Sequence, residues 1–222
     1  MASAAQELGL QYLGISDHSK SSPQANGLNE KRLTAQIEAI AAWNAAHGSS
    51  HFRLFAGSEV DILKDGSLDF DDDLLAKLDF TVASVHNAFT LDEDEMTARI
   101  IRAMENPHIT FLGHMTGRLL LRRDGYKVNH DRIIDAAAAT RTVIELNCNP
   151  KRFDMDWRWW RRARDKGVLC SINPDAHAAR DLQYLRLGVG VARKGWLRRG
   201  DVIGTKSLEE ISAWLALPKS AR

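Results

Sequence analysis

The 222-residue sequence has only two cysteines, Cys148 and Cys170, and their spacing fits neither a zinc ribbon nor a redox pair. It also lacks any apolar run of about 18 residues, the length a membrane helix needs, and its N-terminus has no basic region followed by an apolar core. The formal net charge is only +1, so no overall field drives the chain onto nucleic acid or membrane. These absences predict a cytoplasmic protein with buried thiols and no membrane partner.

Short apolar runs alternate along the chain with longer amphipathic stretches, and 44% of the residues are hydrophobic, enough for one domain with an ample core. This alternation is typical of βα units around a parallel sheet and predicts an α/β fold. Six strands are predicted, at 12–15, 53–56, 80–85, 109–112, 142–146 and 168–172. Helices are predicted at 30–46 with Asn29 as N-cap, and at 93–104, 131–139, 157–166 and 207–215, while residues 1–9 resemble the back half of a helix.

Polar side chains follow every predicted strand, and four histidines lie at such ends: His18, His86, His114 and His177. Glu59 and Asp175 lie at two of the same ends. A single histidine at a strand end is more often a hydrogen-bonded loop residue than a ligand. In a parallel α/β barrel, however, all these ends meet on one face, so the pattern predicts a site for zinc, manganese or iron(II). We interpret the other histidines as solvated or structural: His47, His51, His108 and His130.

The motifs at these strand ends are similar to those of one known family. They read G-I-S-D-H-S from Gly14, G-S-E-V-D from Gly57, A-S-V-H from Ala83, G-H-M-T-G-R from Gly113 and N-P-D-A-H from Asn173. This set resembles the PHP (polymerase and histidinol phosphatase) superfamily, and 113–126, 144–152 and 191–196 resemble the PHP domain of bacterial and archaeal family X DNA polymerases. The resemblance implies a distorted (β/α)7 barrel with up to three metal ions and hydrolysis of phosphoesters. It also implies 3′-to-5′ exonuclease or related activity on DNA ends, of the kind used in DNA repair.

The same resemblance implies a role for each residue. Glu59 would bridge two metals, with His86 and His114 on one and Asp175 on the other, so that Glu59 and Asp175 are the predicted catalytic carboxylates. His18 and His177 would hold the third metal. Four polar neighbours either orient the ligands or serve only as solvated or turn-forming groups: Asp17, Asp61, Asn147 and Asn149.

One motif of the family is absent, because no His-x-His occurs anywhere in the sequence. Together with the six predicted strands, this leads us to expect a single PHP domain over 1–222 that is truncated at its N-terminus and lacks the first barrel strand. Three of about nine family ligands would then be missing. A missing strand would also leave two open sheet edges, which favour instability or association.

The predicted substrate is DNA or another phosphoester, with phosphate contacts from Arg118, Arg123 and Arg152. For Arg122 and Arg123, a solvated face is the favoured alternative. The tryptophans of 155–162 suit base stacking, but packing of an outer helix is the favoured interpretation. A fused or separate family X polymerase core is a predicted partner. Two alternatives stay open: a small-molecule phosphomonoesterase of histidinol-phosphatase type, and a non-catalytic, truncated PHP module.

Overall fold

The computed structural model describes residues 1–49 and 51–222, and its centre is a parallel sheet of six strands that follow one another in chain order. β2, β3 and β5 are buried over almost their whole length, as expected for parallel strands covered on both faces. The strands are β1 (Tyr12–His18), β2 (Arg53–Asp61), β3 (Phe80–Ser84), β4 (Phe111–Leu112), β5 (Val143–Asn147) and β6 (Cys170–Asn173).

Helices connect the strands and surround the sheet. Asn29 caps the first long helix by accepting a hydrogen bond from the Arg32 amide, and Ser207 forms the expected capping box with Glu210. The α-helices are α1 (Ala2–Glu7), α2 (Glu30–His47), α3 (Asp72–Leu75), α4 (Glu93–Glu105), α5 (His130–Thr140), α6 (Trp157–Asp165), α7 (Leu185–Lys194) and α8 (Leu208–Ala216). Short 3-10 turns lie at Pro23–Ala25, Ala179–Tyr184, Arg199–Asp201, Ile203–Thr205 and Lys219–Ala221.

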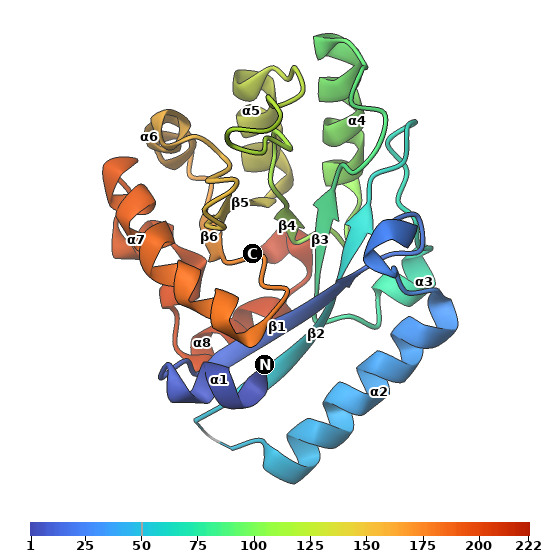
Figure 1. The fold of residues 1–222 in the computed structure, drawn as a ribbon, viewed down its shortest axis with the longest axis vertical. Helices are drawn as coiled ribbons and strands as arrows, with labels where there is room; N and C mark the ends of the chain where they lie inside the picture. The colour runs from blue at the N-terminus through green and yellow to red at the C-terminus, as the bar shows by residue number, and fades with distance from the viewer. Residues whose placement is uncertain (50) are drawn as a thin grey trace.

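The sheet is curled into a half-barrel, and Figure 1 shows α2, α4, α5 and α6 around its outer side. Its register places the carboxyl ends of neighbouring strands beside each other, with His18 opposite Glu59 and Asp61 opposite Ser84. Within the described residues, β1 and β6 are the two edges and do not pair with each other. The predicted α/β fold with six parallel strands is therefore confirmed, and the carboxyl ends of the strands lie at the same rim.

The largest hydrophobic cluster lies between the second half of the sheet and α4, α5 and α6. Trp160 is fully buried in it, and Trp159 stacks on His130 with ring centroids 4.4 Å apart. These contacts support the packing interpretation of the tryptophan-rich segment over base stacking. Within the described residues, no helix combines the length and apolar character needed to cross a membrane.

Two helices were not predicted. α7 contains Gly188 and Gly190. A Cβ on Gly188 would lie 2.3 Å from Ile172 Cγ2 and 2.7 Å from Cys148 Cβ, so glycine lets α7 approach β5 and β6 closely. The short α3 begins at Asp72.

Candidate metal centre

Four ligand-type side chains meet at the carboxyl ends of the first four strands. His114 Nε2 lies 2.9 Å and His86 Nε2 3.3 Å from Glu59 Oε1, and His18 Nδ1 lies 3.5 Å from Glu59 Oε2. The His18 and His86 rings have centroids 4.9 Å apart, and those of His86 and His114 are 5.1 Å apart. His18 on β1, together with His86 and His114 after β3 and β4, thus surrounds the carboxylate of Glu59 on β2.

Several atoms of this cluster are buried without a hydrogen-bond partner, namely His18 Nδ1, Glu59 Oε1 and His86 Nε2. Unpaired buried polar atoms are costly and rare in native proteins, so a group of them facing one another is typical of a site that binds an ion. One ligand atom from each of these residues lies within 4.8 Å of the others, a spacing that suits a shared ion. The imidazole and carboxylate set fits zinc, manganese or iron(II).

The charge state of the cluster also fits a cation site. Burial alone would raise the pKa of Glu59, but the adjacent His114 and His86 imidazoles outweigh it and hold that pKa well below its usual range. Burial would lower the pKa of His86, but its hydrogen bond to Asp61 and the adjacent Glu59 carboxylate raise it to about 9 in the metal-free protein. A cation that displaces the His86 proton therefore meets an ionised carboxylate.

Asp61 fixes the orientation of His86. Its carboxylate is buried, contacts His86 Nδ1 through Oδ1, and accepts a hydrogen bond of 2.9 Å from Ser22 Oγ through Oδ2. The Asp61 amide in turn donates to Ser19 Oγ. With Nδ1 occupied in this way, the Nε2 atom of His86 is directed at Glu59, the arrangement in which a carboxylate orients a histidine ligand.

We expect Asp61→Ala to weaken divalent metal binding by about 10–100-fold, because outer partners of metal ligands typically contribute that much. The His86 ring would lose the contact that aims it. The measurement is a Mn²⁺ titration of the purified variant, with the exposed Asp73→Ala as the matched control. An unchanged affinity in Asp61→Ala would mean that packing alone orients His86.

A second group of polar residues lies beside the cluster, where β5 and β6 end. Asp175 Oδ2 accepts a hydrogen bond of 3.0 Å from Asn147 Nδ2 and lies 3.3 Å from Arg152 Nε. The Asp175 backbone is left-handed, with φ of 49°. His177 is largely exposed, and its ring centroid is 6.3 Å from that of His18. This group borders the cluster without closing on Glu59.

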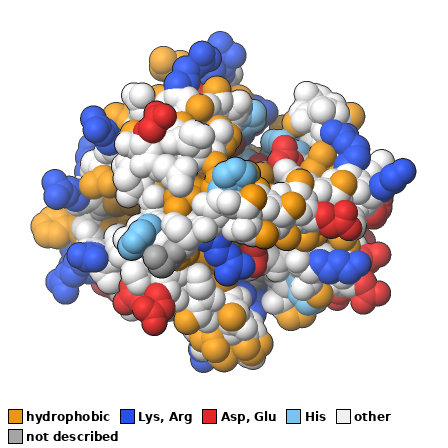
Figure 2. All heavy atoms as spheres, turned by 90° about the horizontal axis from the view of Figure 1, so that it is seen from below, with side chains coloured by type: hydrophobic (Ala, Val, Ile, Leu, Met, Phe, Trp, Pro, Cys, Tyr) orange, Lys and Arg blue, Asp and Glu red, His pale blue; other side chains and the backbone are white. Residues whose placement is uncertain are grey.

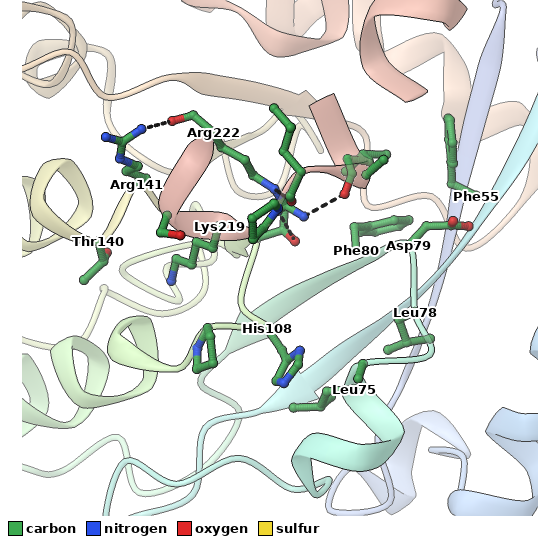
Figure 3. Close-up of a pocket in the computed structure, with 18 of the residues that line it drawn as sticks. Phe55, Leu75, Leu78, Asp79, Phe80, His108, Thr140, Arg141, Lys219 and Arg222 are labelled. Carbon is green, nitrogen blue, oxygen red and sulfur yellow. Dashed lines mark hydrogen bonds between the residues drawn. The ribbon is translucent and has the colours of Figure 1, made fainter. Parts of the chain in front are cut away.

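The opposite end of the sheet holds a cavity of about 920 Å³, drawn in Figure 3. Phe55, Phe80 and Arg141 line it from the amino ends of the strands. Its cationic groups are already engaged: Lys219 donates to the Met104 and Asn106 carbonyls, Arg222 to Thr110 Oγ1 and two carbonyls, and Arg141 to the Arg222 carbonyl. The candidate ligand atoms converge at the other end of the sheet, away from this cavity.

No family model matches the chain. Its sequence is 41% identical over 215 residues to the DNA polymerase/3′-5′ exonuclease PolX of Bacillus subtilis, covering 97% of this chain and 37% of that protein. It is 25% identical over 218 residues to a probable phosphatase of Thermoanaerobacter, covering 92% of this chain and 82% of the relative. The chain is homologous to PHP-type phosphatases. It spans little more than a third of the length of PolX.

The PHP fold is also seen in a solved structure. Histidinol phosphate phosphatase from Lactococcus lactis superposes with a TM-score of 0.56 at 15% identity, covering 92% of this chain and 89% of that one. That crystal structure is a complex with zinc, L-histidinol and phosphate. At this identity the likeness concerns the fold, and it agrees with the curled parallel sheet described above.

The structure brings together most of the ligands that the PHP resemblance implied, but it groups them differently. His18 lies nearer to His86, at 4.9 Å between centroids, than to His177, at 6.3 Å. It therefore joins Glu59 and His86 in one cluster. The predicted pairing of His18 with His177 on a separate metal stays a prediction.

Two polar neighbours from the PHP motifs lie away from the ligands. Asp17 is exposed and accepts a hydrogen bond from Gln36 on α2, because successive strand residues point to opposite faces and His18 takes the inner one. Asn149 caps the turn after β5 by accepting from the Lys151 amide. These contacts match the solvated and turn-forming alternatives, whereas Asp61 and Asn147 contact ligands directly.

The predicted phosphate-binding arginines also differ from one another. Arg118 donates to Asp156 Oδ2 at 2.9 Å, to the Arg152 carbonyl and to the Phe153 carbonyl, so its donors hold the 152–156 loop. The side chain of Arg123 lies over the Phe89 ring and donates to the Gly117 carbonyl. Arg152 alone of the three contacts a predicted ligand, Asp175. A phosphate contact is therefore best placed on Arg152.

Glu145 was not predicted as a site residue. It lies in β5, is 5% exposed, and accepts hydrogen bonds from the His114 amide and from the Asn147 and Asn173 side chains. Burial raises the pKa of Glu145 to about 7. The available signal was an acidic residue inside the apolar run Val143-Ile-Glu-Leu, since a buried carboxylate needs partners.

Proposed function

We propose that the chain is a metal-dependent phosphoesterase that hydrolyses phosphodiester bonds at DNA ends, as the PolX resemblance suggests. The observation that carries the proposal is the group of buried, unpaired ligand atoms on His18, Glu59 and His86. The 41% identity to PolX supports the DNA-directed form of the activity. Up to three ions of zinc, manganese or iron are proposed, and zinc is the metal named in the structural neighbour.

Divalent ions bound at such a centre polarise phosphoryl oxygens and make water a stronger nucleophile. The chain's own residues would hold and orient them: Glu59 would supply the central carboxylate, His86 is aimed by Asp61, and Asp175 is held by Asn147. Arg152 is available to a phosphate oxygen beside Asp175. Among the residues assigned here, none is a protein nucleophile.

The surface charge bears on how a nucleic acid would be held. On the face drawn in Figure 2, Lys and Arg side chains are scattered among acidic and apolar ones. With a formal net charge of +1, the phosphate contacts must come from local groups such as Arg152. A polymerase core, fused or separate, is the proposed partner, because the PolX relative is much longer than this chain. A cytoplasmic location and a role in DNA repair stay predictions.

A small-molecule phosphomonoesterase is the second candidate. It is favoured by the relatives named as probable phosphatases and by the structural neighbour complexed with L-histidinol and phosphate. The two candidates differ in the substrate and share the metal centre. A truncated module without activity would bind its partner and turn over neither substrate.

The test offers both substrate classes to the same preparation with Mn²⁺: a 5′-labelled single-stranded oligonucleotide and the phosphomonoester p-nitrophenyl phosphate. We expect products that shorten from the 3′ end and little release from the monoester. His86→Ala, prepared in parallel, should abolish the cleavage. Turnover of the monoester alone would support the second candidate, and turnover of neither would overturn the proposed activity.

A further inference from the structure

Glu145 occupies a buried position where an apolar side chain would cost less free energy to bury. It lies between Ile144 and Leu146 in a strand that is buried throughout. Its Oε2 accepts from the His114 amide at 2.6 Å and from Asn147 Nδ2 at 3.2 Å, and its Oε1 accepts from Asn173 Nδ2 at 3.0 Å. Burying a carboxylate costs free energy that these hydrogen bonds must offset, and well-packed apolar residues often do equally well. A role beyond packing is therefore worth seeking.

All three donors lie at the carboxyl ends of β4, β5 and β6, on the rim where the candidate ligands are. The His114 amide is the backbone of a ligand on the Glu59 side of the centre. Asn147 and Asn173 lie at the ends of β5 and β6, and Asn173 precedes Asp175 by two residues. The Glu145 carboxylate thus connects the strand that carries His114 to the two strands that hold Asp175.

The Asn147 amide extends this connection to the Asp175 side chain. Its Nδ2 lies 3.2 Å from Glu145 Oε2 and 3.0 Å from Asp175 Oδ2, so each amide hydrogen has its own carboxylate. Its Oδ1 accepts from the Asn149 amide, which prevents the side chain from turning over. Without Glu145, one amide hydrogen would lose its acceptor, and Asp175 would be held less firmly beside Arg152.

We propose that Glu145 is a positioning residue that sets the separation of His114 and Asp175, and so allows both sides of the centre to hold metal ions together. The inference rests on the proposed metal-dependent function and extends it to a residue that touches neither metal nor substrate. Outer partners of this kind typically change metal affinity by about 10–100-fold.

The structure suggests a charge-conserving test. In Glu145→Gln, the amide oxygen can still accept from His114 and Asn147, but the new NH₂ group faces Asn173 Nδ2, donor against donor. In Asn173→Asp, two carboxylates face each other. Combining the two substitutions restores a donor–acceptor pair and the original charge, and Oδ1 at position 173 can still accept the hydrogen bond from Ser171 Oγ.

The readout is Mn²⁺ binding to each purified variant, monitored through the electron paramagnetic resonance signal of the free ion. The unfolding midpoint of each variant is measured separately in EDTA. We expect each single variant to bind at least one Mn²⁺ about 10–100-fold more weakly, and the double variant to recover most of that loss. The exposed Glu38→Gln should bind like the wild type.

Wild-type affinity in both single variants would overturn the positioning role, as would a double variant that recovers its unfolding midpoint but not its metal affinity. Binding is measured without turnover, so the two proposals fail in different ways. A wild-type chain that binds Mn²⁺ but cleaves nothing overturns the proposed function and leaves the inference standing. A wild-type chain that binds no Mn²⁺ overturns both.

Discussion

Glu59→Gln is expected to lower metal affinity and phosphoesterase activity by more than 100-fold. Glu59 is 8% exposed and is the carboxylate that faces three histidines, with His114 Nε2 at 2.9 Å and His86 Nε2 at 3.3 Å from its Oε1. An amide supplies no negative charge and a weaker ligand oxygen, so the imidazoles would surround a cation without a counter-charge. Because outer partners alone contribute about 10–100-fold, a central ligand should exceed that range.

The measurement is the number of metal ions per chain by inductively coupled plasma mass spectrometry, together with cleavage of the labelled oligonucleotide. Glu38→Gln makes the same chemical change on the exposed face of α2 and should leave both readouts unchanged. Full metal content in Glu59→Gln would show that the ions are held elsewhere. The cluster around Glu59 would then not be the metal centre.

The rim of polar residues could be predicted from two features together: the positions of the strands along the sequence and the common direction of parallel strands. Apolar runs of strand length fixed the six strands, and parallel strands necessarily present their carboxyl ends on one face. His18, Glu59, His86 and His114 meet for that reason alone. Which side chains could share one ion depends on how the imidazole rings are oriented, and the spacing of residues along the chain does not determine this. The grouping of His18 with Glu59 and His86 is therefore visible only in the structure.

Other features were hidden by tertiary effects that a single sequence does not display. α7 was missed because two glycines weaken its helix propensity, while its stability comes from the close approach of Gly188 to Ile172 and Cys148. Arg118 suggested a phosphate contact, yet its donors are used by a loop more than thirty residues away. Local pattern identifies chemical groups, and long-range packing decides which of them remain free for a ligand.

In the metal-free chain, His86 is expected to make stability fall as the pH rises. Its hydrogen bond to Asp61 and the adjacent Glu59 carboxylate outweigh burial and raise its pKa to about 9, against about 6.5 in the unfolded chain. The folded state therefore binds the extra proton more tightly. The resulting stabilisation is complete below pH 6.5 and is lost as the pH rises through about 9, and it amounts to about 3 kcal/mol.

The free energy of unfolding should be measured in urea with EDTA at several pH values from 6 to 9.5, for the wild type and for His86→Gln. The difference between the two curves isolates His86, because other groups titrate in the same range. Burial lowers the pKa of Lys219 to about 8, so its contribution increases stability above pH 8 and opposes that of His86. Burial raises the pKa of Glu145 to about 7, which lowers stability between about pH 4.5 and 7. A difference that does not vary with pH would mean that His86 has the same pKa in the folded and the unfolded chain, and that metal binding at neutral pH need displace little proton from it.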